Sequence, residues 1–319
     1  MNIDVSFIIV SWNSRDLLVK CIDSILSRKL KIRYEVIVVD NASTDDSAET
    51  VRVRYPGIKL IENKENFGFA KSNNIGIRSS SGKYVCLINS DVEVLESCVD
   101  KLYDFMESDP SVGIVGPKIV GRDNLVQRSC MGFPTLWNLF SRAMALDLLF
   151  PRTKLFGSYM MTYCTHDSVR EVDVINGCFW MVRRKTMLCV GLLDETFFIY
   201  AEDIDWCRRF KQSGARVIYY PFAEAIHYGG GSSKNAPIRF YMEMQKANFS
   251  YWKKYHNIAS QQAYLLLRIL HEGIRVVGHV VFAVLSERRR AISFEKAKRS
   301  VVSIQFAASS IGNLLFSRL

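Results

Sequence analysis

Unbroken apolar runs alternate with helical patterns through the first 120 residues, and this alternation limits the chain to a small set of folds. Such runs are typical of strands covered on both faces. They occupy five segments: Val5–Val10, Glu35–Val39, Lys59–Ile61, Tyr84–Ile88 and Gly113–Val120. Helical spacing fills the intervals: Leu17–Leu26, Asp45–Tyr55, Ala70–Arg78 and Ser97–Met106. We therefore predict an α/β fold with a mostly parallel central sheet flanked by helices.

An irregular stretch separates this region from a second set of elements. Residues 121–170 are rich in aromatic side chains and contain the breakers Pro134, Pro151 and Gly157. We expect long loops and short helices there, with the character of a mobile lid. Beyond them the pattern predicts a strand, a helix and a further strand: Gly177–Val182, Asp203–Gln212 and Ala215–Tyr220.

Polar residues follow the predicted strands where a parallel sheet binds ligands. Ser11 and Asn13 follow the first strand, Asp40 follows the second, and Asn89-Ser90-Asp91 follows the fourth. Ligands of open α/β sheets bind outside the carboxyl ends of the strands. Helix capping by residues such as Asn41, Ser43 or Asp45 accounts for one polar residue per loop, but not for the two acids placed directly at strand ends. We therefore predict a ligand site at this edge. Dinucleotide and P-loop glycine motifs are absent, which disfavours those two classes.

The segment "FFIYAEDIDWCRRF" (197–210) sets three acids among aromatic residues. Asp205 is predicted to form a structural ion pair with Arg208 or Arg209 at helical spacing. Glu202 or Asp203 would then face the ligand, and the aromatic surroundings would raise the carboxyl pKa toward that of a general base. The alternative is that the acids only complement the dipole of the helix that they begin.

Asp91 and His227 form a candidate metal site for a hard divalent cation, Mg²⁺ or Mn²⁺, bridging a diphosphate. Asn89 lies two residues before Asp91, and Gly229-Gly230-Gly231 follows His227 and would let backbone N–H groups approach an anion. The alternative for His227 is a partly buried loop histidine without a ligand.

The C-terminal part of the chain carries almost all of the net charge. Residues 238–319 hold 13 Lys/Arg and 4 Asp/Glu, whereas the first 237 residues are nearly balanced. The segment 264–290 is apolar but is interrupted by Arg268, His271, Glu272, Arg275 and His279, which argues against an ordinary spanning helix. We predict a catalytic domain at 1–237 and a basic amphipathic helical region at 238–319 that attaches to an anionic membrane surface. A basic cap on the first domain or a dimer surface is the alternative, and nucleic acid is disfavoured because no recognition motif is present.

The compartment is predicted from the N-terminus and the cysteines. The first apolar run lacks a basic segment before it and is about six residues long, so it resembles a buried strand more than a signal peptide. The eight cysteines form no C-x-x-C pair, which favours buried free thiols. We predict a cytoplasmic protein, peripheral on the inner face of the cell membrane.

Seven motifs in order resemble family 2 glycosyltransferases of the GT-A (Rossmann-like) fold, and within them the rhamnosyltransferase-like branch. They lie between residues 5 and 233: "SFIIVSWN", "VIVVDNASTD", "NFGFAKSNNIGI", "YVCLINSDVEV", "VINGCFWMVRR", "GLLDETFFIYAEDIDWCRRFKQSG" and "HYGGGSS". Each motif alone is weak, but their order and spacing together make the resemblance specific.

The resemblance implies a role for each matching residue. Asp40 would bind the pyrimidine of a nucleotide-sugar, Asp203 would be the catalytic base of the Glu202-Asp203 motif, and His227 would bind the metal. Asn89-Ser90-Asp91 replaces the family's D-x-D motif; the first Asp is Asn here, so Asp91 carries most of the metal binding. Further donor contacts are expected at Ser11, Asn13, Asn66, Gly68, Asn74, Asn89 and Ser90. Acceptor contacts are expected at Gly177, Trp180, Trp206, Gly229 and Gly230, with core packing as the alternative for both tryptophans.

The predicted function is an inverting, metal-dependent glycosyltransferase of cell-surface or cell-wall polysaccharide biosynthesis. The branch favours transfer of L-rhamnose from dTDP-L-rhamnose to a hydroxyl of a glycan or lipid-linked oligosaccharide. A UDP-sugar donor (UDP-GlcNAc, UDP-Glc or UDP-Gal) and a non-catalytic nucleotide-sugar-binding relative are the alternatives. A sugar-nucleotide pyrophosphorylase is disfavoured, because no glycine-rich basic loop follows the first strand.

Overall fold

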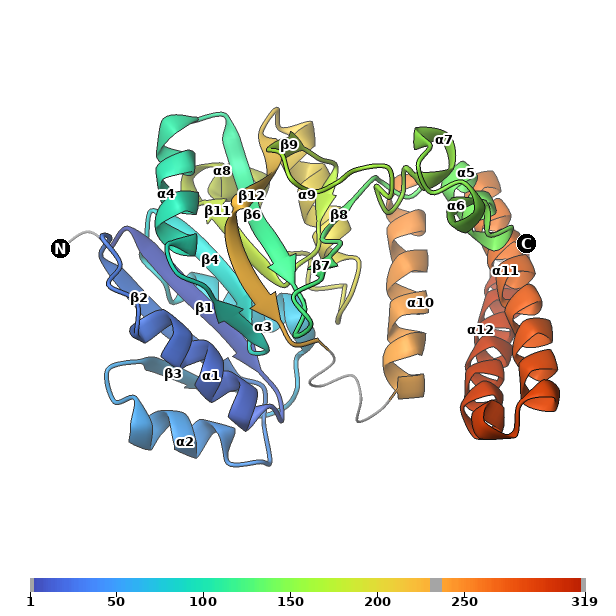
Figure 1. Cartoon of the computed structure of the whole chain (residues 1–319), viewed down its shortest axis with the longest axis horizontal. Helices are drawn as coiled ribbons and strands as arrows, with labels where there is room; N and C mark the ends of the chain where they lie inside the picture. Colours follow the sequence, from blue (N-terminus) through green and yellow to red (C-terminus); the bar gives the residue numbers. More distant parts are fainter. Residues whose placement is uncertain (1–2, 230–236, 317–319) are drawn as a thin grey trace. The chain divides into compact units, whose positions relative to one another are not determined.

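The computed structural model describes residues 3–229 and 237–316 and divides the chain into two compact units (Figure 1). The α/β unit comprises Met1–Phe133 and Thr165–Asn235, and the helical unit comprises Pro134–Cys164 and Ala236–Leu319. The predicted boundary at 237/238 therefore needs one correction. Residues 134–164, predicted as part of the first domain, belong with the C-terminal helices because α5 (Leu136–Ala143) packs on α11 (Ile258–Leu285).

The α/β unit is built on a mixed sheet of ten strands in the order β3-β2-β1-β4-β11-β6-β12-β5, with β7 beside β6 and β9 beside β12. The strands β3-β2-β1-β4 are parallel, as is the pair β6–β12, whereas β5, β7, β9 and β11 run antiparallel to their neighbours. The predicted parallel arrangement is thus found in the N-terminal half. The strands are β1 (Val5–Ser11), β2 (Tyr34–Asp40), β3 (Lys59–Glu62), β4 (Tyr84–Asn89), β5 (Val92–Val94), β6 (Val112–Val120), β7 (Val126–Gln127), β9 (Arg170–Glu171), β11 (Phe179–Arg183) and β12 (Arg216–His227). A separate pair joins β8 (Cys130–Met131) to β10 (Val174–Ile175).

Helices cover both faces of this sheet (Figure 1). The helix α1 shows why: Leu18, Cys21, Ile22 and Ile25 recur at helical spacing and are buried against the strands. On the opposite face Gly76 of α3 approaches Ile8, and a Cβ there would lie 2.5 Å from its side chain. The helices of this unit are α1 (Arg15–Leu26), α2 (Ser47–Arg54), α3 (Gly68–Arg78), α4 (Cys98–Ser108), α8 (Arg184–Val190) and α9 (Glu202–Gln212). All the helices predicted here are present, within about two residues.

The strand β12 is longer than predicted and bends between Tyr220 and Glu224, where its register against β6 shifts. Pro221 lies in the bend and has no N–H for the ladder. Beyond the bend β12 pairs with β5, so that His227 lies opposite Val92. The bend therefore carries His227 to the residue that follows Asp91.

The helical unit holds α5, α6 (Leu146–Leu149), α7 (Lys154–Gly157), α10 (Pro237–Tyr255), α11, a 3₁₀ turn η2 (Glu287–Arg289) and α12 (Arg290–Phe316). Residues 134–164 form three short helices in this unit, in agreement with the short helices predicted for this stretch. In the described part of the chain, α11, α12 and the other helices all fall short of the length and apolar character needed to cross a membrane. All eight cysteines are free; Cys189 is exposed, Cys164 is half-buried and the others are buried, close to the prediction.

Candidate active site

Asp40 lies at the carboxyl end of β2 and presents a carboxylate oxygen that needs a donor. Its side chain is 3% exposed, and Oδ2 accepts the Ser43 N–H at 2.9 Å. Among the described residues Oδ1 has no hydrogen-bond partner, although it is buried. An unsatisfied buried oxygen is costly. Oδ1 is therefore suited to accept an N–H from a bound molecule.

Asn13 and Ser11 support the same edge of the sheet. The Asn13 side-chain oxygen accepts the Thr44 N–H at 2.7 Å, and its own N–H donates to Ser43 Oγ at 3.0 Å. Ser11 and Ser90, which were predicted to bind the donor, are joined through Ser14: Oγ distances are 3.0 Å from Ser11 to Ser14 and 2.8 Å from Ser14 to Ser90. These side chains tie the ends of β1 and β4 together and hold the loop beside Asp40.

The pairing of β12 with β5 places the side chains of Asp91 and His227 next to each other. His227 Nε2 lies 3.3 Å from Asp91 Oδ1. Gln127 determines the tautomer: its amide Nε2 donates to the His227 carbonyl at 2.9 Å, so its Oε1 is left to accept from His227 Nδ1 at 3.0 Å. The Nε2 lone pair then faces a carboxylate oxygen, and a proton or metal cation must separate the two acceptors.

These groups fit a hard divalent ion. Two adjacent ligands of an octahedral ion with bonds of about 2.1 Å lie about 3.0 Å apart, close to the separation of these two atoms. Asn89 Oδ1 is also buried without a partner among the described residues. Within residues 3–229 and 237–316 no three His, Cys, Asp or Glu side chains form a metal-binding group, so an ion held by Asp91 and His227 takes its other ligands from Asn89, water or substrate.

The acids at the start of α9 have unlike environments. Glu202 is 5% exposed, and burial, with a smaller contribution from Asp203, raises its pKa well above the usual range. Burial also raises the pKa of Asp203, to about 6. The pKa of Asp203 is raised less than that of Glu202, because the Asp203 carboxylate accepts backbone N–H groups, from Ile204 at 2.8 Å and from Gly177. Burial therefore favours the neutral form of Glu202 more strongly than that of Asp203, and the N–H donors make Asp203 the better candidate for a carboxylate at neutral pH.

Gly177 and Cys178 link the metal-type pair to this acid, since the Gly177 N–H donates to the Asp203 carboxylate and Cys178 is hydrogen-bonded to the end of β4. Burial raises the pKa of the Cys178 thiol to about 12, and the nearby charges of Asp91 and Asp203 contribute to the shift. The Cys178 carbonyl also accepts the Asn89 N–H at 3.0 Å, which joins β11 to the end of β4. The candidate base Asp203 and the two candidate metal ligands are therefore linked through residues 177–178 at the carboxyl edge of the sheet.

Comparison with known proteins is consistent with this geometry. Residues 6–185, more than half of the chain, match glycosyl transferase family 2. The chain belongs to this family. A relative in Mycobacterium tuberculosis strain H37Rv, N-acetylglucosaminyl-diphospho-decaprenol L-rhamnosyltransferase, is 28% identical over 233 residues, 70% of this chain and 75% of the relative. Rhamnosyltransferase WbbL of Escherichia coli K12 is 24% identical over 261 residues, 77% and 92% of the two chains.

A solved structure shows the same fold. Mannosyltransferase PcManGT from Pyrobaculum calidifontis, in complex with GDP-Man and Mn²⁺, matches with a TM-score of 0.55 and 17% identity, over 99% of this chain and 79% of that one. The GT-A fold and the glycosyltransferase class predicted from the sequence are confirmed.

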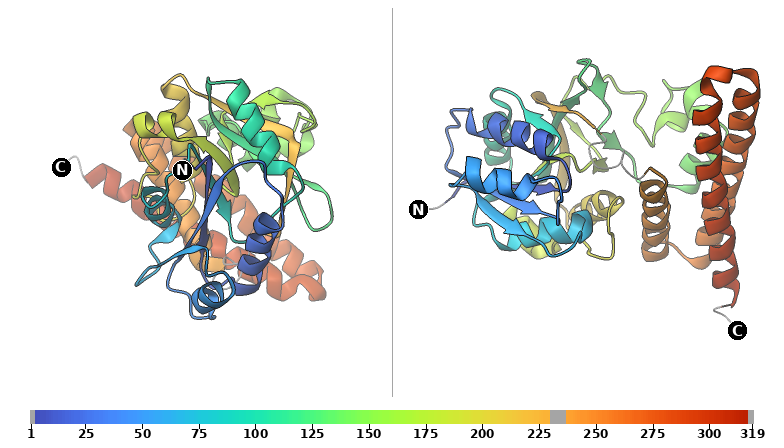
Figure 2. Two further views of the ribbon diagram at one scale, coloured as in Figure 1. Left: turned by 90° about the vertical axis from the view of Figure 1, so that its left-hand side faces the viewer. Right: turned by 90° about the horizontal axis from the view of Figure 1, so that it is seen from below.

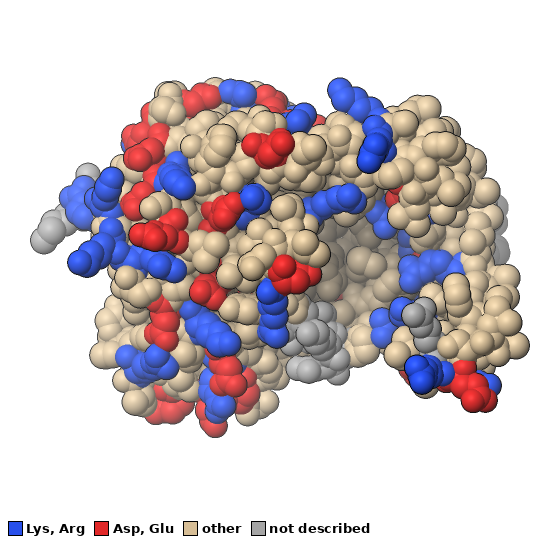
Figure 3. Space-filling view, in the orientation of Figure 1, with Lys and Arg blue, Asp and Glu red and all other residues tan. Residues whose placement is uncertain are grey.

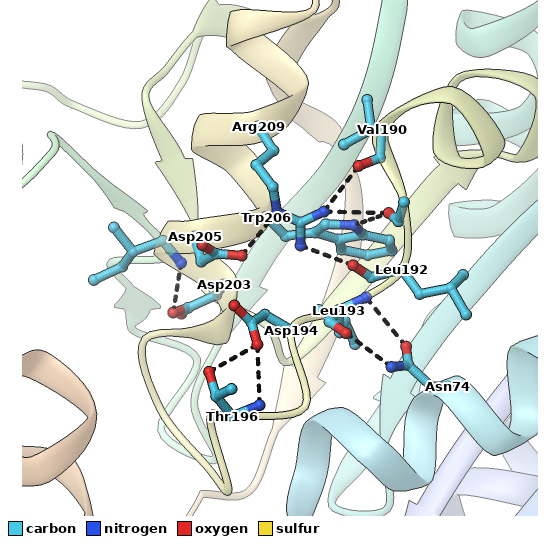
Figure 4. A network of polar contacts seen from close by, with 12 residues as sticks. Asn74, Val190, Leu192, Leu193, Asp194, Thr196, Asp203, Asp205, Trp206 and Arg209 are labelled. Carbon is cyan, nitrogen blue, oxygen red and sulfur yellow. Dashed lines mark hydrogen bonds and ion pairs between the residues drawn. The ribbon is translucent and has the colours of Figure 1, made fainter. Parts of the chain in front are cut away.

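A network around residues 190–196 positions the start of α9 in this family 2 glycosyltransferase (Figure 4). The Arg209 guanidinium donates to the carbonyls of Val190 at 3.1 Å and Leu192 at 2.8 Å. It also pairs with Asp205 at 2.9 Å, which confirms the predicted ion pair. Asn74 on α3 exchanges hydrogen bonds with the backbone of Leu193 at 2.8 and 3.1 Å. The loop before the acids is thus held from two sides.

Several residues predicted to contact the donor also make contacts within the protein. The Asn74 amide is occupied by this network, and Asn66 Oδ1 accepts from Asn41 Nδ2 at 3.0 Å and from the Gly68 N–H at 2.9 Å. Gly68 has φ +79°, and a Cβ there would lie 2.2 Å from the Phe198 carbonyl oxygen. These residues bring α3 against the loop before α9 and so shape the site from outside it.

The tryptophans lie in the core, which favours the alternative left open above. Trp180 and Trp206 are fully buried, with ring centroids 5.7 Å apart. Their indole N–H groups donate to the carbonyls of Ile175 and Gly191. With no exposed ring face, neither can stack on a sugar here. Gly177 is needed beside them, because a Cβ would lie 2.8 Å from the Trp180 ring.

The glycine loop is described only in part. Gly229 has φ +67° and open space around its Cα. Gly230, also predicted to contact the acceptor, lies outside the described residues.

Sequence reasoning missed Gln127 and Ser14. The strand that holds Gln127 has only two residues and follows β6 across a short turn, so its apolar pattern is too short to predict a strand.

Proposed function

We propose that this glycosyltransferase moves L-rhamnose from dTDP-L-rhamnose to a hydroxyl of a glycan or lipid-linked oligosaccharide, with inversion at the anomeric carbon, in cell-surface polysaccharide biosynthesis. The observation that carries the reaction type is that Asp203 is hydrogen-bonded to Gly177 while the next residue, Cys178, is hydrogen-bonded to Asn89, two residues before the Asp91 that lies against His227. The rhamnose donor is favoured by the relatives, since two are named rhamnosyltransferases.

Asp203 acts as the base in this proposal. Its ionised carboxylate takes the proton of the acceptor hydroxyl while that oxygen forms a bond to the anomeric carbon. The bond from that carbon to the diphosphate oxygen breaks, and the nucleoside diphosphate leaves with the electron pair. One displacement needs one base, and Asp203, whose carboxylate accepts the Ile204 N–H, is the less strongly perturbed of the two acids.

Asp40 accounts for pyrimidine recognition. The imide N–H of thymine or uracil would donate to its unsatisfied Oδ1. Because both bases carry this N–H, a UDP-sugar is the alternative donor. Asp91 and His227, with Asn89, would hold Mg²⁺ or Mn²⁺, which supplies positive charge to the diphosphate leaving group; the structural neighbour binds Mn²⁺ with its nucleotide-sugar. Peripheral attachment to the cytoplasmic membrane face would bring the enzyme to a lipid-linked acceptor.

Rate should depend on pH through Asp203. A base works only when ionised, and the pKa of this one is raised to about 6. We expect kcat to be level above about pH 7 and to fall toward tenfold per unit below pH 6. Single-turnover rates between pH 4.5 and 8.5 at saturating donor measure this. A fall in kcat that begins only near pH 4, the ordinary pKa of an aspartate, would contradict the assignment of Asp203 as the base.

The donor is tested by titrating the full chain with dTDP-rhamnose, UDP-glucose, UDP-N-acetylglucosamine, UDP-galactose and GDP-mannose, with Mg²⁺ or Mn²⁺ and with EDTA. We expect metal-dependent binding of dTDP-rhamnose. Asp40→Asn should weaken it about 10- to 100-fold, the value of a hydrogen bond to a charged group. Asp45→Asn is the matched control, since Asp45 accepts from Arg15 and Ser47 backbone N–H groups nearby. Preference for a UDP-sugar overturns the donor assignment, and no binding of any of the five by the folded protein contradicts the proposed function.

A further inference from the structure

The long helices of the helical unit are apolar on their outer side. In α11 the side chains Leu266, Leu270, Ile274, Val277, Val281 and Val284 follow one another at intervals of three or four residues. They are between 43% and 71% exposed. A surface helix of a water-soluble domain turns such a stripe inward. The apolar stripe of α11 therefore lies on the solvent-exposed side, which is polar in helices of water-soluble domains.

The inner side of the same two helices is largely polar or small, apart from Tyr264 and Leu265 in the first half of α11. Glu272 is fully buried in the middle of α11, where it accepts the Tyr241 hydroxyl of α10 at 2.6 Å and pairs with Arg268. The buried positions of α12 are small, and they recur at helical spacing: Ser293, Ala297, Ser300, Ser303, Ala307 and Ser310. Polar and small residues within and apolar residues outside are typical of helices packed in a lipid environment.

The turn between α11 and α12 joins an apolar end to a basic one. Val280, Val281, Phe282, Val284 and Leu285 are all exposed, and at 100° per residue they point to most sides of the helix. From Glu287 to Arg299 the chain has six basic and two acidic residues. The hairpin of two long helices is visible in Figures 1 and 2, and in Figure 1 its turn lies at the end away from α5–α7. Figure 3 shows basic side chains at the lower end of this unit as well as higher up.

We propose that the α11–α12 hairpin inserts its apolar tip and outer stripe into one leaflet of an anionic phospholipid membrane, with Arg288, Arg290, Lys296 and Lys298 on the lipid phosphates. The inference rests on the membrane location proposed above and specifies the segment and depth; it does not depend on the donor. Charged groups recur along α11, and no helix of the described residues is long and apolar enough to cross a membrane. Insertion into a single leaflet agrees with both observations.

Lipid explains the tip better than a second copy of the chain does. A protein interface needs one complementary face, whereas this tip is apolar around most of its circumference. Two copies would also bring their basic residues together, while anionic headgroups complement them. Self-association is accordingly the competing outcome of the test.

The test is flotation of the full chain with vesicles of phosphatidylcholine alone or with 30% phosphatidylglycerol (roughly a bacterial anionic fraction). We expect binding to the anionic vesicles and a bound-to-free ratio at least about tenfold lower for Leu285→Asp, because a carboxylate disfavours apolar surroundings. Val53→Asp, at a 71% exposed valine of the α/β unit, is the matched control and should bind like wild type. Arg288→Glu with Lys298→Glu should remove the preference for anionic vesicles.

A conservative variant measures depth without disturbing the fold. Phe294→Trp replaces a ring that is 54% exposed, and its added emission should be quenched by lipids brominated on their acyl chains. Three results would overturn the proposal. The first is equal vesicle binding by wild type and Leu285→Asp, and the second is the absence of quenching. The third is a dimer in sedimentation that Leu285→Asp abolishes. Donor titration of the same samples separates the two proposals, since lost donor binding with intact flotation rejects only the function.

Discussion

Asp203→Asn should lower kcat by about 10²- to 10⁴-fold, the range that a positioned base contributes, and should leave the donor dissociation constant within about twofold. Asparagine keeps the size of the side chain and can still accept the Ile204 N–H, but it cannot take a proton from the acceptor. Transfer rates and donor titrations on the same protein measure the two effects separately.

The adjacent acid supplies the comparison. Glu202 is buried and its pKa is raised well above the usual range, so glutamine keeps the size of the side chain in the neutral form that burial favours. We expect Glu202→Gln to lower kcat by less than about tenfold. A large loss in Glu202→Gln beside an active Asp203→Asn would reverse the roles of the two acids.

Arg209→Ala should destabilise the α/β unit by about 3–5 kcal/mol, the cost of removing one partner of a buried ion pair. Asp205 is fully buried and Arg209 is 19% exposed. The change also removes the donors to the carbonyls of Val190 and Leu192, so the loop before the acids loses its anchor. Denaturant unfolding followed by the fluorescence of the buried tryptophans measures the change.

Two further variants test whether the large loss of stability in Arg209→Ala comes from the burial of the ion pair. Arg216→Ala breaks ion pairs with Asp109 and Glu171 that are 32–44% exposed, and should cost at most about 1 kcal/mol. Arg209→Lys keeps a charge but loses the planar fork, and should lie between wild type and Arg209→Ala. Equal losses at positions 209 and 216 would contradict the anchoring role of Arg209.

The fold was predictable because its signals are local. Apolar runs such as Val5–Val10 and the spacing of Leu18, Cys21 and Ile22 depend only on neighbouring residues, and each matches an element of the structure. The acids, the strand-end residues and the Asp205–Arg209 pair were likewise predictable from spacing. The antiparallel strands and the grouping of residues 134–164 with the C-terminal helices were not, because they depend on contacts between distant segments.

The site shows the same division. Sequence alone determined the family, the identity of Asp40, Asp91, Asp203 and His227 as candidates, and the basic character of the C-terminal helices. Only the tertiary structure decided which side chains are already engaged within the protein. The Asn74 amide is hydrogen-bonded to the Leu193 backbone, and the rings of Trp180 and Trp206 are buried in the core. The physical reason is that a side chain's chemical type is written in the sequence, whereas its free donors, acceptors and faces depend on what the fold places beside it.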